Sequence, residues 1–394
     1  DPLASYLDIE AIVSAAKEVG ADAVHPGYGF LSENAAFAER LSDEGINFIG
    51  PSPESLRLFG DKIAARKAMS DAGIPVAIGT DEPVSDFSEA SNIANEIGFP
   101  LMIKAASGGG GIGMQIVEAP SEFENSLRLC QSRSFSAFGD DRVFIEKFIG
   151  GAEHIEFQVV GDGKKAIHIG ERFCSIQRRH QKIVEEGPWL STTQRKKIGD
   201  LVVAGAEAIG YKGLATFEFL RDSSGEFYFM EVNPRVQVEH TVTEMISGID
   251  LVSLGIRIAS GEDLPLDQNE ISLQGHAIQV RINAENPLTM QPSPGRIWEC
   301  HWPGGPGIRV DSHANTGYEI PECFDSLLAK IIAWAPTRDE AIDRLYSALD
   351  ETILLGVETL IPLHRAILME SDFRERKINT DYLQSHNSEL LGGD

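Results

Sequence analysis

Cysteines, basic residues and long apolar runs are all scarce in this chain of 394 residues. Its four cysteines stand far apart without a CxxC pair, which argues against a disulfide scaffold or a zinc ribbon and favours reduced thiols. No run approaches the roughly 18 apolar residues of a membrane span, and no basic-then-apolar signal peptide opens the sequence. We therefore expect a cytoplasmic protein with no membrane partner, or one of the mitochondrial matrix if the chain is eukaryotic.

Positive charge is in deficit, with 34 Lys and Arg against 60 Asp and Glu and a formal net charge of −26. A surface this acidic repels a phosphate backbone, so we expect no nucleic-acid partner. Apolar residues make up 42% of the chain and charged residues 24%, a globular balance that excludes a disordered tail or a collagen-like repeat. An anionic ligand must therefore meet a locally basic site.

The first part of the chain alternates helix and strand patterns. We expect amphipathic helices at 8–19 and 32–44, the second capped by Ser32. Short apolar strands are expected at 21–25 and 46–49. This alternation is typical of a doubly wound parallel sheet, but two strands are few for one, so we infer that an upstream portion is missing. One or two further helices are expected over 51–72.

A second unit begins near Val76 and mixes helices with strands. We expect it to contain the helix 88–97, the strands 100–104, 114–117 and 143–147, the helix 121–132 and a turn-rich connector over 134–140. From Glu153 onward strands dominate, with a helix at 192–209 and a hairpin of 215–220 and 226–232. The last part is mixed, with strands near 277–282, 307–310 and 328–333 and a helix over 338–351. The fold class is therefore α/β and α+β in several domains.

The first chemical signal is a glycine run after the strand that ends in Lys104. Gly108, Gly109, Gly110, Gly111 and Gly113 leave backbone amides uncovered, so the loop can close over phosphate oxygens. A strand-like segment follows instead of a helix, and no Gly-Lys-Ser/Thr occurs, so the run is neither a dinucleotide fingerprint nor a Walker A loop. We predict a phosphate lid with Lys104 beneath it, and a flexible linker is the alternative interpretation.

The second signal is the hairpin of 215–220 and 226–232. Pairing across its turn brings Glu218 near Glu231, and Asn233 projects on the same face, which makes a set of hard oxygen ligands for Mg²⁺ or Mn²⁺. The alternation continues through Arg235, Gln237 and Glu239. A solvated edge strand is the alternative interpretation of this polar stripe.

The third signal is a basic cluster, Gln-Arg-Arg-His-Gln-Lys at 177–182, in a strongly acidic chain. It has no interleaved aromatic residues, so we interpret it as a pocket for phosphate or a small oxyanion, with a surface ion-pair cluster as the alternative. His154 and Arg281, each in a predicted strand, would by themselves be structural residues.

These motifs stand in order along the chain, and residues 231–240 read Glu-Val-Asn-Pro-Arg-Val-Gln-Val-Glu-His. Together with the segments 25–34, 281–285 and 292–296 they resemble a biotin carboxylase of the ATP-grasp superfamily. The resemblance covers roughly residues 5 to 382. It implies a truncated doubly wound N-terminal domain, an ATP-grasp fold and a C-terminal mixed β domain.

The resemblance also suggests how the chain is divided and what it does. We expect an incomplete N-terminal domain at 1–50, a helical linker at 51–75, a lid subdomain at 76–148, and the large ATP-grasp subdomain with the C-terminal domain at 149–390. The implied activity is the ATP- and bicarbonate-dependent carboxylation of biotin through carboxyphosphate, the first half-reaction of a biotin-dependent carboxylase.

The resemblance implies roles for individual residues. The residues implied to bind ATP are Lys62, Lys104, the glycines of the run, Glu146, Lys147, Ile149, His154, Gln177, His180 and Leu220. Glu218, Glu231 and Asn233 would hold two Mg²⁺ or Mn²⁺ ions. Bicarbonate would be seated by Lys182, Arg235, Gln237 and Val238, with Glu239 as general base and Arg281 beside the oxygen of deprotonated biotin.

Strand geometry conflicts with one of these implied roles. On a straight strand Arg235 and Glu239 would lie about 13 Å apart, too far for both to touch one bicarbonate. We therefore predict a bend or bulge between them, at Pro234 or within 236–238.

No Ala-Met-Lys-Met biotin-attachment motif occurs in the sequence. The biotin, its carrier domain and the carboxyltransferase are therefore expected on other chains or on deleted segments. The family's usual assembly is a homodimer, which no feature of the sequence itself indicates.

Two other functions stay open at this point: another ATP-grasp ligase, of the carbamoyl-phosphate or purine-pathway type, and a non-catalytic nucleotide-binding subunit. The family commonly has basic residues where this chain has Ile112 and Gln115. This departure points either to weaker ATP capture or to a different final acceptor.

Overall fold

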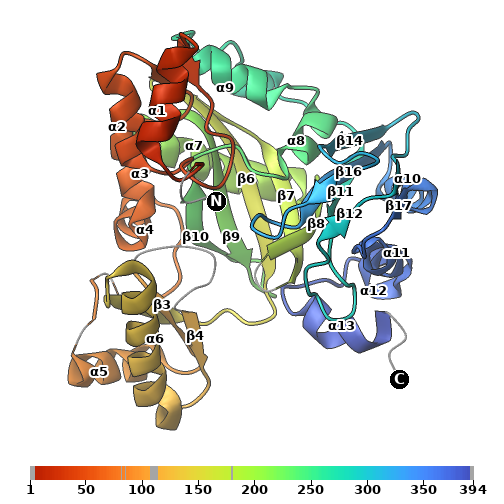
Figure 1. Ribbon diagram of the computed structural model, residues 1–394. Helices are drawn as coiled ribbons and strands as arrows, with labels where there is room; N and C mark the ends of the chain where they lie inside the picture. Colours follow the sequence, from red (N-terminus) through yellow and green to blue (C-terminus); the bar gives the residue numbers. More distant parts are fainter. Residues whose placement is uncertain (1–4, 81, 85, 107–113, 179–180, 391–394) are drawn as a thin grey trace.

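A computed structural model describes residues 5–80, 82–84, 86–106, 114–178 and 181–390. It contains a small N-terminal unit, a separate lobe below it, and a large sheet that continues into the C-terminal region (Figure 1). The expected α/β and α+β multidomain class is confirmed. No helix of the described residues is long and apolar enough to cross a membrane.

The N-terminal unit has the predicted order of elements, α1 (Ile9–Glu18), β1 (Ala23–Val24), α2 (Ala35–Asp43) and β2 (Asn47–Phe48), with β1 and β2 parallel. The prediction of Ser32 as helix cap is wrong. Asn34 caps α2, because its side chain accepts a hydrogen bond from the amide of Phe37. Two helices follow, α3 (Pro53–Gly60) and α4 (Lys62–Asp71), as the pattern over 51–72 allowed.

The described part of the separate lobe contains a three-stranded antiparallel sheet in the order β4-β3-β5, covered by helices (Figure 1). Its elements are α5 (Phe87–Ile97), β3 (Leu101–Ala105), β4 (Met114–Val117), the 3₁₀ turn η2 (Pro120–Glu122), α6 (Phe123–Phe138) and β5 (Val143–Lys147). The predicted connector over 134–140 is wrong, because α6 continues to Phe138. No Gly or Pro interrupts that helix before Gly139, which ends it in the left-handed conformation with a φ of 70°.

Within the described ranges, eight strands form the main sheet, in the order β10-β9-β6-β7-β8-β11-β16-β14. They are β6 (Glu153–Asp162), β7 (Ala166–Arg178), β8 (Gln181–Gly187), β9 (Lys212–Arg221), β10 (Phe227–Asn233), β11 (His276–Asn283), β14 (Ile308–Ser312) and β16 (Leu327–Ala335). The antiparallel contact of β8 with β11 joins the middle of the chain to its C-terminal region.

The two faces of the main sheet are covered differently. Helix α7 (Thr192–Ala208) packs on the face that carries Phe157 and Phe217. The opposite face carries α8 (His240–Ser247) and α9 (Leu251–Ala259), and α9 packs on Val160 and Leu214. Since side chains alternate along a strand, Glu156, Thr216 and Glu218 share this second face. Beyond α8 and α9 it carries polar residues, and the candidate site lies there.

The remaining elements complete the C-terminal region. They are η3 (Gln268–Glu270), β12 (Gly295–Arg296), β13 (Glu299–His301), β15 (Glu319–Ile320), α10 (Arg338–Glu351), β17 (Ile353–Leu355), α11 (Ile361–Met369), α12 (Ser371–Arg374) and α13 (Tyr382–Leu390). Helix α10 has the predicted bounds and packs on β16 and β11.

Candidate functional site

The β9–β10 hairpin places two carboxylates directly opposite each other. Glu231 pairs with Glu218 because the register shifts between Phe229 and Glu231, so one extra residue is accommodated on β10. Asn233 Nδ2 donates a hydrogen bond to Glu218 Oε1 at 2.8 Å. The prediction that Glu218 and Glu231 are neighbours, with Asn233 on the same face, is therefore confirmed.

The polar stripe stops being a strand at Asn233. There the chain turns: the amide of Arg235 donates to the carbonyl of Asn233, and Glu239 becomes the residue before α8. The turn returns Gln237 to the sheet, where its Nε2 donates to Glu218 Oε1 at 2.8 Å. The expected bend within 234–238 is confirmed, whereas the expectation that the alternating stripe continues to Glu239 is wrong.

Lys182 is at the centre of the site. Its Nζ lies 2.8 Å from both Glu218 Oε1 and Glu239 Oε1, and it also forms an ion pair with Glu156. Arg281, on the neighbouring strand β11, lies 3.0 Å from Glu239 Oε2 and 2.6 Å from Glu185 Oε1. The contact of β8 with β11 thus brings two cations to one carboxylate, that of Glu239.

The charged groups of the cluster keep one another ionised. Burial acts to raise the pKa of Glu239, but Lys182, Arg281 and Arg172 outweigh it and hold that pKa below its ordinary value. Glu218 has its pKa shifted in the same direction, since Lys182 and His154 outweigh its burial. Conversely, three carboxylates raise the pKa of Lys182 against the effect of burial. All three groups are therefore charged at neutral pH.

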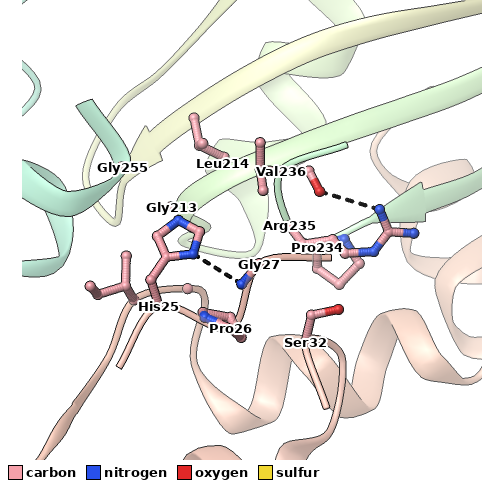
Figure 2. Close-up of a pocket in the computed structure, with 12 residues that line it drawn as sticks. His25, Pro26, Gly27, Ser32, Gly213, Leu214, Pro234, Arg235, Val236 and Gly255 are labelled. Atoms are coloured by element: carbon pink, nitrogen blue, oxygen red, sulfur yellow. Dashed lines mark hydrogen bonds between the residues drawn. The ribbon is translucent and has the colours of Figure 1, made fainter. Parts of the chain in front are cut away.

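Arg235 lies outside this cluster. Its Nε lies 2.5 Å from Glu33 Oε1, and its Nη2 donates to Asn233 Oδ1 at 2.9 Å. Figure 2 shows Arg235 with Pro234 and Val236 on one side of a small pocket, and His25, Pro26 and Ser32 of the N-terminal unit on the other. The N-terminal segment 25–34 is thereby held against the turn that follows β10.

The nucleotide-binding candidates fall into two groups. On the main sheet, His154 Nε2 lies 2.7 Å from Glu218 Oε2, His154 Nδ1 lies 2.5 Å from the Gln177 amide, and Leu220 is the cross-strand partner of His154. Near them, Lys62 Nζ lies 3.8 Å from Glu231 Oε2.

The other group belongs to the separate lobe. There Lys104 forms an ion pair with Glu146 across β3 and β5. Lys147 donates to the carbonyls of Gly98 and Phe99, and Ile149 is half-buried just after β5. The glycine run at 108–113 and His180 lie outside the described residues.

Sequence reasoning missed three buried members of the site. Glu156, Arg172 and Glu185 are fully buried and contact Lys182, Glu156 and Arg281 respectively. A signal for Glu156 did exist, because His154, Glu156 and Gln158 alternate with apolar residues and share the face of Glu218. Arg172 and Glu185 had no comparable signal, because they lie on β7 and β8 where charged residues interrupt the alternation of polar and apolar residues.

Comparison with known proteins decides the family. Residues 1–56 match the family "Biotin carboxylase, N-terminal domain", residues 61–267 match "Carbamoyl-phosphate synthase L chain, ATP binding domain", and residues 279–385 match "Biotin carboxylase C-terminal domain". The chain belongs to the biotin carboxylase family. As a biotin carboxylase it is an ATP-dependent ligase that carries out the first half-reaction of a biotin-dependent carboxylase.

Individual biotin carboxylases are similar along nearly the whole chain. "Biotin carboxylase, chloroplastic" of Arabidopsis thaliana is 50% identical over 390 residues, which are 98% of this chain and 73% of the relative. The biotin carboxylase domain dimer of Hydrogenobacter thermophilus 2-oxoglutarate carboxylase, solved with MgADP, ADP and bicarbonate, superposes with a TM-score of 0.96 at 46% identity, covering 99% of this chain and 87% of that one. The solved biotin carboxylase subunit of a pyruvate carboxylase superposes with a TM-score of 0.84 at 45% identity, and the coverage is again 99% and 87%.

Proposed function

We propose that ATP, bicarbonate and biotin meet on the face of the main sheet that carries Lys182, Glu218 and Glu239. The observation that carries the proposal is the sharing of one buried carboxylate, Glu239, by two cations, Lys182 and Arg281. This arrangement offers a proton acceptor beside positive charge in an otherwise acidic protein. A reaction that begins from a small anion and must remove its proton needs both.

Glu239 is the general base of the proposed reaction. Its carboxylate is ionised at neutral pH because Lys182 and Arg281 lower its pKa despite burial. The same two cations make it a weak base, so its pKa must rise when they engage bicarbonate for Glu239 to take the proton. The proton of bicarbonate passes to Glu239, the bicarbonate oxygen bonds to the γ-phosphorus of ATP, and the bond from that phosphorus to the ADP oxygen breaks. The product is carboxyphosphate, in which the carboxyl group is activated for transfer.

Bicarbonate is seated, in this proposal, by Lys182, Arg235, Gln237 and the segment at Val238. Arg235 would present a planar fork of donors to a carboxylate-like anion after leaving Glu33 and Asn233, which it contacts in this structure. The chain turn brings Gln237 back to the face that carries Glu218. Arg281 lies next to Glu239 and stabilises the oxygen of deprotonated biotin. The biotin nitrogen bonds to the carboxyl carbon of carboxyphosphate, the bond from that carbon to the phosphate oxygen breaks, and the released phosphate takes the proton that the biotin nitrogen loses.

Glu218, Glu231 and Asn233 fit a divalent cation. Their side chains carry two carboxylates and an amide oxygen, the ligand types that Mg²⁺ prefers, and the side chain of Glu231 remains 38% exposed. A bound cation would take the place of the contacts that these oxygens now make with Arg235, Lys182 and His154. We propose that they hold two Mg²⁺ or Mn²⁺ ions. Bound with ATP, such ions neutralise the charge that develops on the phosphates. The related Hydrogenobacter domain was solved with MgADP.

The remaining candidates bind the nucleotide. We propose that Lys62 and Lys104 hold phosphates, His154, Gln177 and His180 line the pocket, Glu146, Lys147 and Ile149 contact the adenine, and Leu220 lies beneath it. Support comes from the alignment of His154, Gln177 and Leu220 on one face next to Glu218. The glycines of 108–113 would close over the phosphates.

The biotin is expected on a carrier domain that works with this chain and with a carboxyltransferase. One similar solved structure is described as the biotin carboxylase subunit of pyruvate carboxylase, so in that relative the biotin carboxylase is one component of a larger enzyme. The Hydrogenobacter domain was solved as a dimer. We propose a homodimer for this chain as well.

ATP hydrolysis by the full-length protein tests the proposal. With Mg²⁺ present, we expect hydrolysis to require bicarbonate and to rise when free biotin is added, with carboxybiotin as product. Hydrolysis that is independent of both would favour another ATP-grasp ligase. Nucleotide binding without any turnover would favour a non-catalytic role, and either result would overturn the proposal.

A further inference from the structure

Arg172 is a fully buried cation beneath the proposed bicarbonate site. It lies on β7, where it is the cross-strand partner of Glu156, and its side chain has no exposed surface. A buried guanidinium is costly unless its donors are paired. The groups that accept its hydrogen bonds therefore indicate which part of the site Arg172 supports.

All five N–H groups of the Arg172 guanidinium have an acceptor. Nε donates to Glu156 at 2.5 Å, and Nη1 donates to Gln158 at 2.9 Å and Thr243 at 2.8 Å. Nη2 donates to Thr216 at 3.2 Å and to Gln237 at 3.0 Å. These acceptors come from β6, β9, α8 and the turn after β10, so one side chain ties four segments together.

Two of these contacts orient groups of the proposed site. Because a guanidinium only donates, it holds Gln237 Oε1 toward itself and leaves Gln237 Nε2 to face Glu218. It also occupies Glu156 Oε1, which leaves Glu156 Oε2 to pair with Lys182. The positions of Gln237 and Lys182 thus both depend on Arg172.

We propose that Arg172 is a positioning residue for bicarbonate: it orients the Gln237 amide and, through Glu156, the Lys182 ammonium. It touches none of the proposed substrates itself. This inference rests on the proposed bicarbonate site. The five acceptors of Arg172 include none of the proposed nucleotide or metal ligands. Gln237 and Lys182 do contact Glu218, so an effect on Mg·ATP can arise only indirectly and is expected to be smaller than the effect on bicarbonate.

Arg172→Lys tests this role because it keeps the charge but loses the fork. A lysine ammonium has three donors at one point and cannot reach acceptors on four segments. We expect the KM for bicarbonate to rise by roughly 10- to 100-fold, the range found for residues that orient the protein ligands of a metal, while the dissociation constant of Mg·ATP changes by less than about threefold. An unchanged KM for bicarbonate, or a parallel loss of Mg·ATP affinity, would overturn the proposal.

Arg338→Lys is the matched control. Arg338 is also a buried arginine, paired with Glu186 and with the carbonyls of Phe373 and Arg374, away from the proposed substrates. We expect this variant to lose stability without a change in the KM for bicarbonate. If it raised that KM as much as Arg172→Lys does, the effect would be structural and the proposal would fail.

A double-mutant cycle tests whether Arg172 acts through Gln237. Gln237→Met removes the amide, and we expect Arg172→Lys to add little to the KM for bicarbonate in that background, because coupled residues are non-additive. Full additivity would contradict a role through Gln237.

Thr243→Val decides the question if Arg172→Lys does not fold. It removes a single acceptor of Arg172, and we expect a rise of several-fold in the KM for bicarbonate, whereas no change would overturn the proposal. The two proposals fail differently: a wild-type protein that needs no bicarbonate refutes the function, whereas a bicarbonate-dependent wild type with a normal Arg172→Lys variant refutes only the role of Arg172.

Discussion

Glu231 and Glu239 lie on one short segment of chain, yet their carboxylates have different neighbours. Glu231 is partly exposed, with Lys62 Nζ 3.8 Å away, whereas Glu239 is buried between Lys182 and Arg281. The first environment suits a metal–nucleotide ligand, and the second suits a base held ionised by two cations. Substitution by Gln keeps the size of each side chain and removes its charge. Comparing the two variants therefore distinguishes a loss of Mg·ATP binding from a loss of the chemical step.

We expect Glu239→Gln to lower biotin carboxylation by roughly 100-fold or more, the usual contribution of a general base, while Mg·ATP binding is retained. Glu231→Gln is the matched variant and should weaken Mg·ATP binding by roughly tenfold or more. Steady-state kinetics and nucleotide titration measure both. Near-wild-type carboxylation by Glu239→Gln removes Glu239 from its role, and an unchanged Mg·ATP affinity in Glu231→Gln removes Glu231 from the metal site.

Single residues were predictable from the sequence where a local pattern exposed them. Glu218, Glu231 and Asn233 follow from a hairpin with an obvious turn, and their proximity is confirmed. Arg172 and Glu185 were not predictable, because each is a charged residue buried by its partner on another strand. Only the folded sheet shows that these charges are paired.

Helices α3 and α4 meet at Asp61, which ends the first and caps the second. Its side chain accepts hydrogen bonds from the amides of Ile63 and Ala64, both at 3.0 Å. Lys62, the first residue of α4, lies near Glu231 at the proposed nucleotide site. The cap therefore stabilises the first turn of α4 and fixes the direction of Lys62, which is proposed to bind the phosphates of ATP.

We expect Asp61→Ala to lower the free energy of unfolding by about 1 kcal/mol, the usual loss for an N-cap, and to weaken Mg·ATP binding. Asp61→Asn is the control, since Asn is an equally good cap and its side-chain oxygen can accept the same bonds. Urea denaturation and nucleotide titration of both variants provide the comparison. Equal losses in the two variants would show that the charge of Asp61 matters and not its cap.

The sequence predicted the ends of helices and strands where neighbouring residues determine them. It did not predict them where contacts with distant segments determine them. The pattern over 338–351 predicted α10 correctly, whereas no pattern predicted that strand β7 continues as far as Arg178. Residues 170–178 include Glu171 and Arg172, and such charges normally indicate an exposed segment. Both are buried here because Arg195 and Glu156 pair with them, a fact of tertiary structure.

At the scale of the whole molecule, one sheet passes from the nucleotide-binding half into the C-terminal region. Strands β8 and β11 form the joint between these two parts. On one face of the sheet Glu185 contacts Arg281, and on the other face Glu186 contacts Arg338. The sequence placed both regions in the range 149–390 but carried no signal that these two strands would pair, because strand neighbours far apart in sequence depend on the complete topology. The joint supports the site, since it brings Arg281 to Glu239.

Glu186 fastens α10 to this joint. Arg338 at the start of α10 forms two hydrogen bonds with the Glu186 carboxylate, and His276 Nε2 lies 2.7 Å from it. Burial acts to raise the pKa of Glu186, but Arg338 and His276 outweigh it and lower the pKa to about 2. A carboxyl with a lowered pKa stabilises the folded state above its unfolded value of about 4.5, and this contribution is lost as the pH falls toward 2.

We expect Glu186→Gln to lower stability by about 3 kcal/mol at pH 7, because it leaves Arg338 buried without its partner charge. The difference from wild type should narrow as the pH falls from about 4.5 toward 2, since the wild-type carboxylate is then protonated as well. Urea unfolding followed by tryptophan fluorescence can report this, because Trp189 lies 5.7 Å from the Arg338 guanidinium. Glu124→Gln in the exposed pair with Arg128 is the control, with an expected change below about 0.5 kcal/mol. A difference between Glu186→Gln and wild type that stays constant from pH 7 to pH 3 would contradict the ionised pair at the joint.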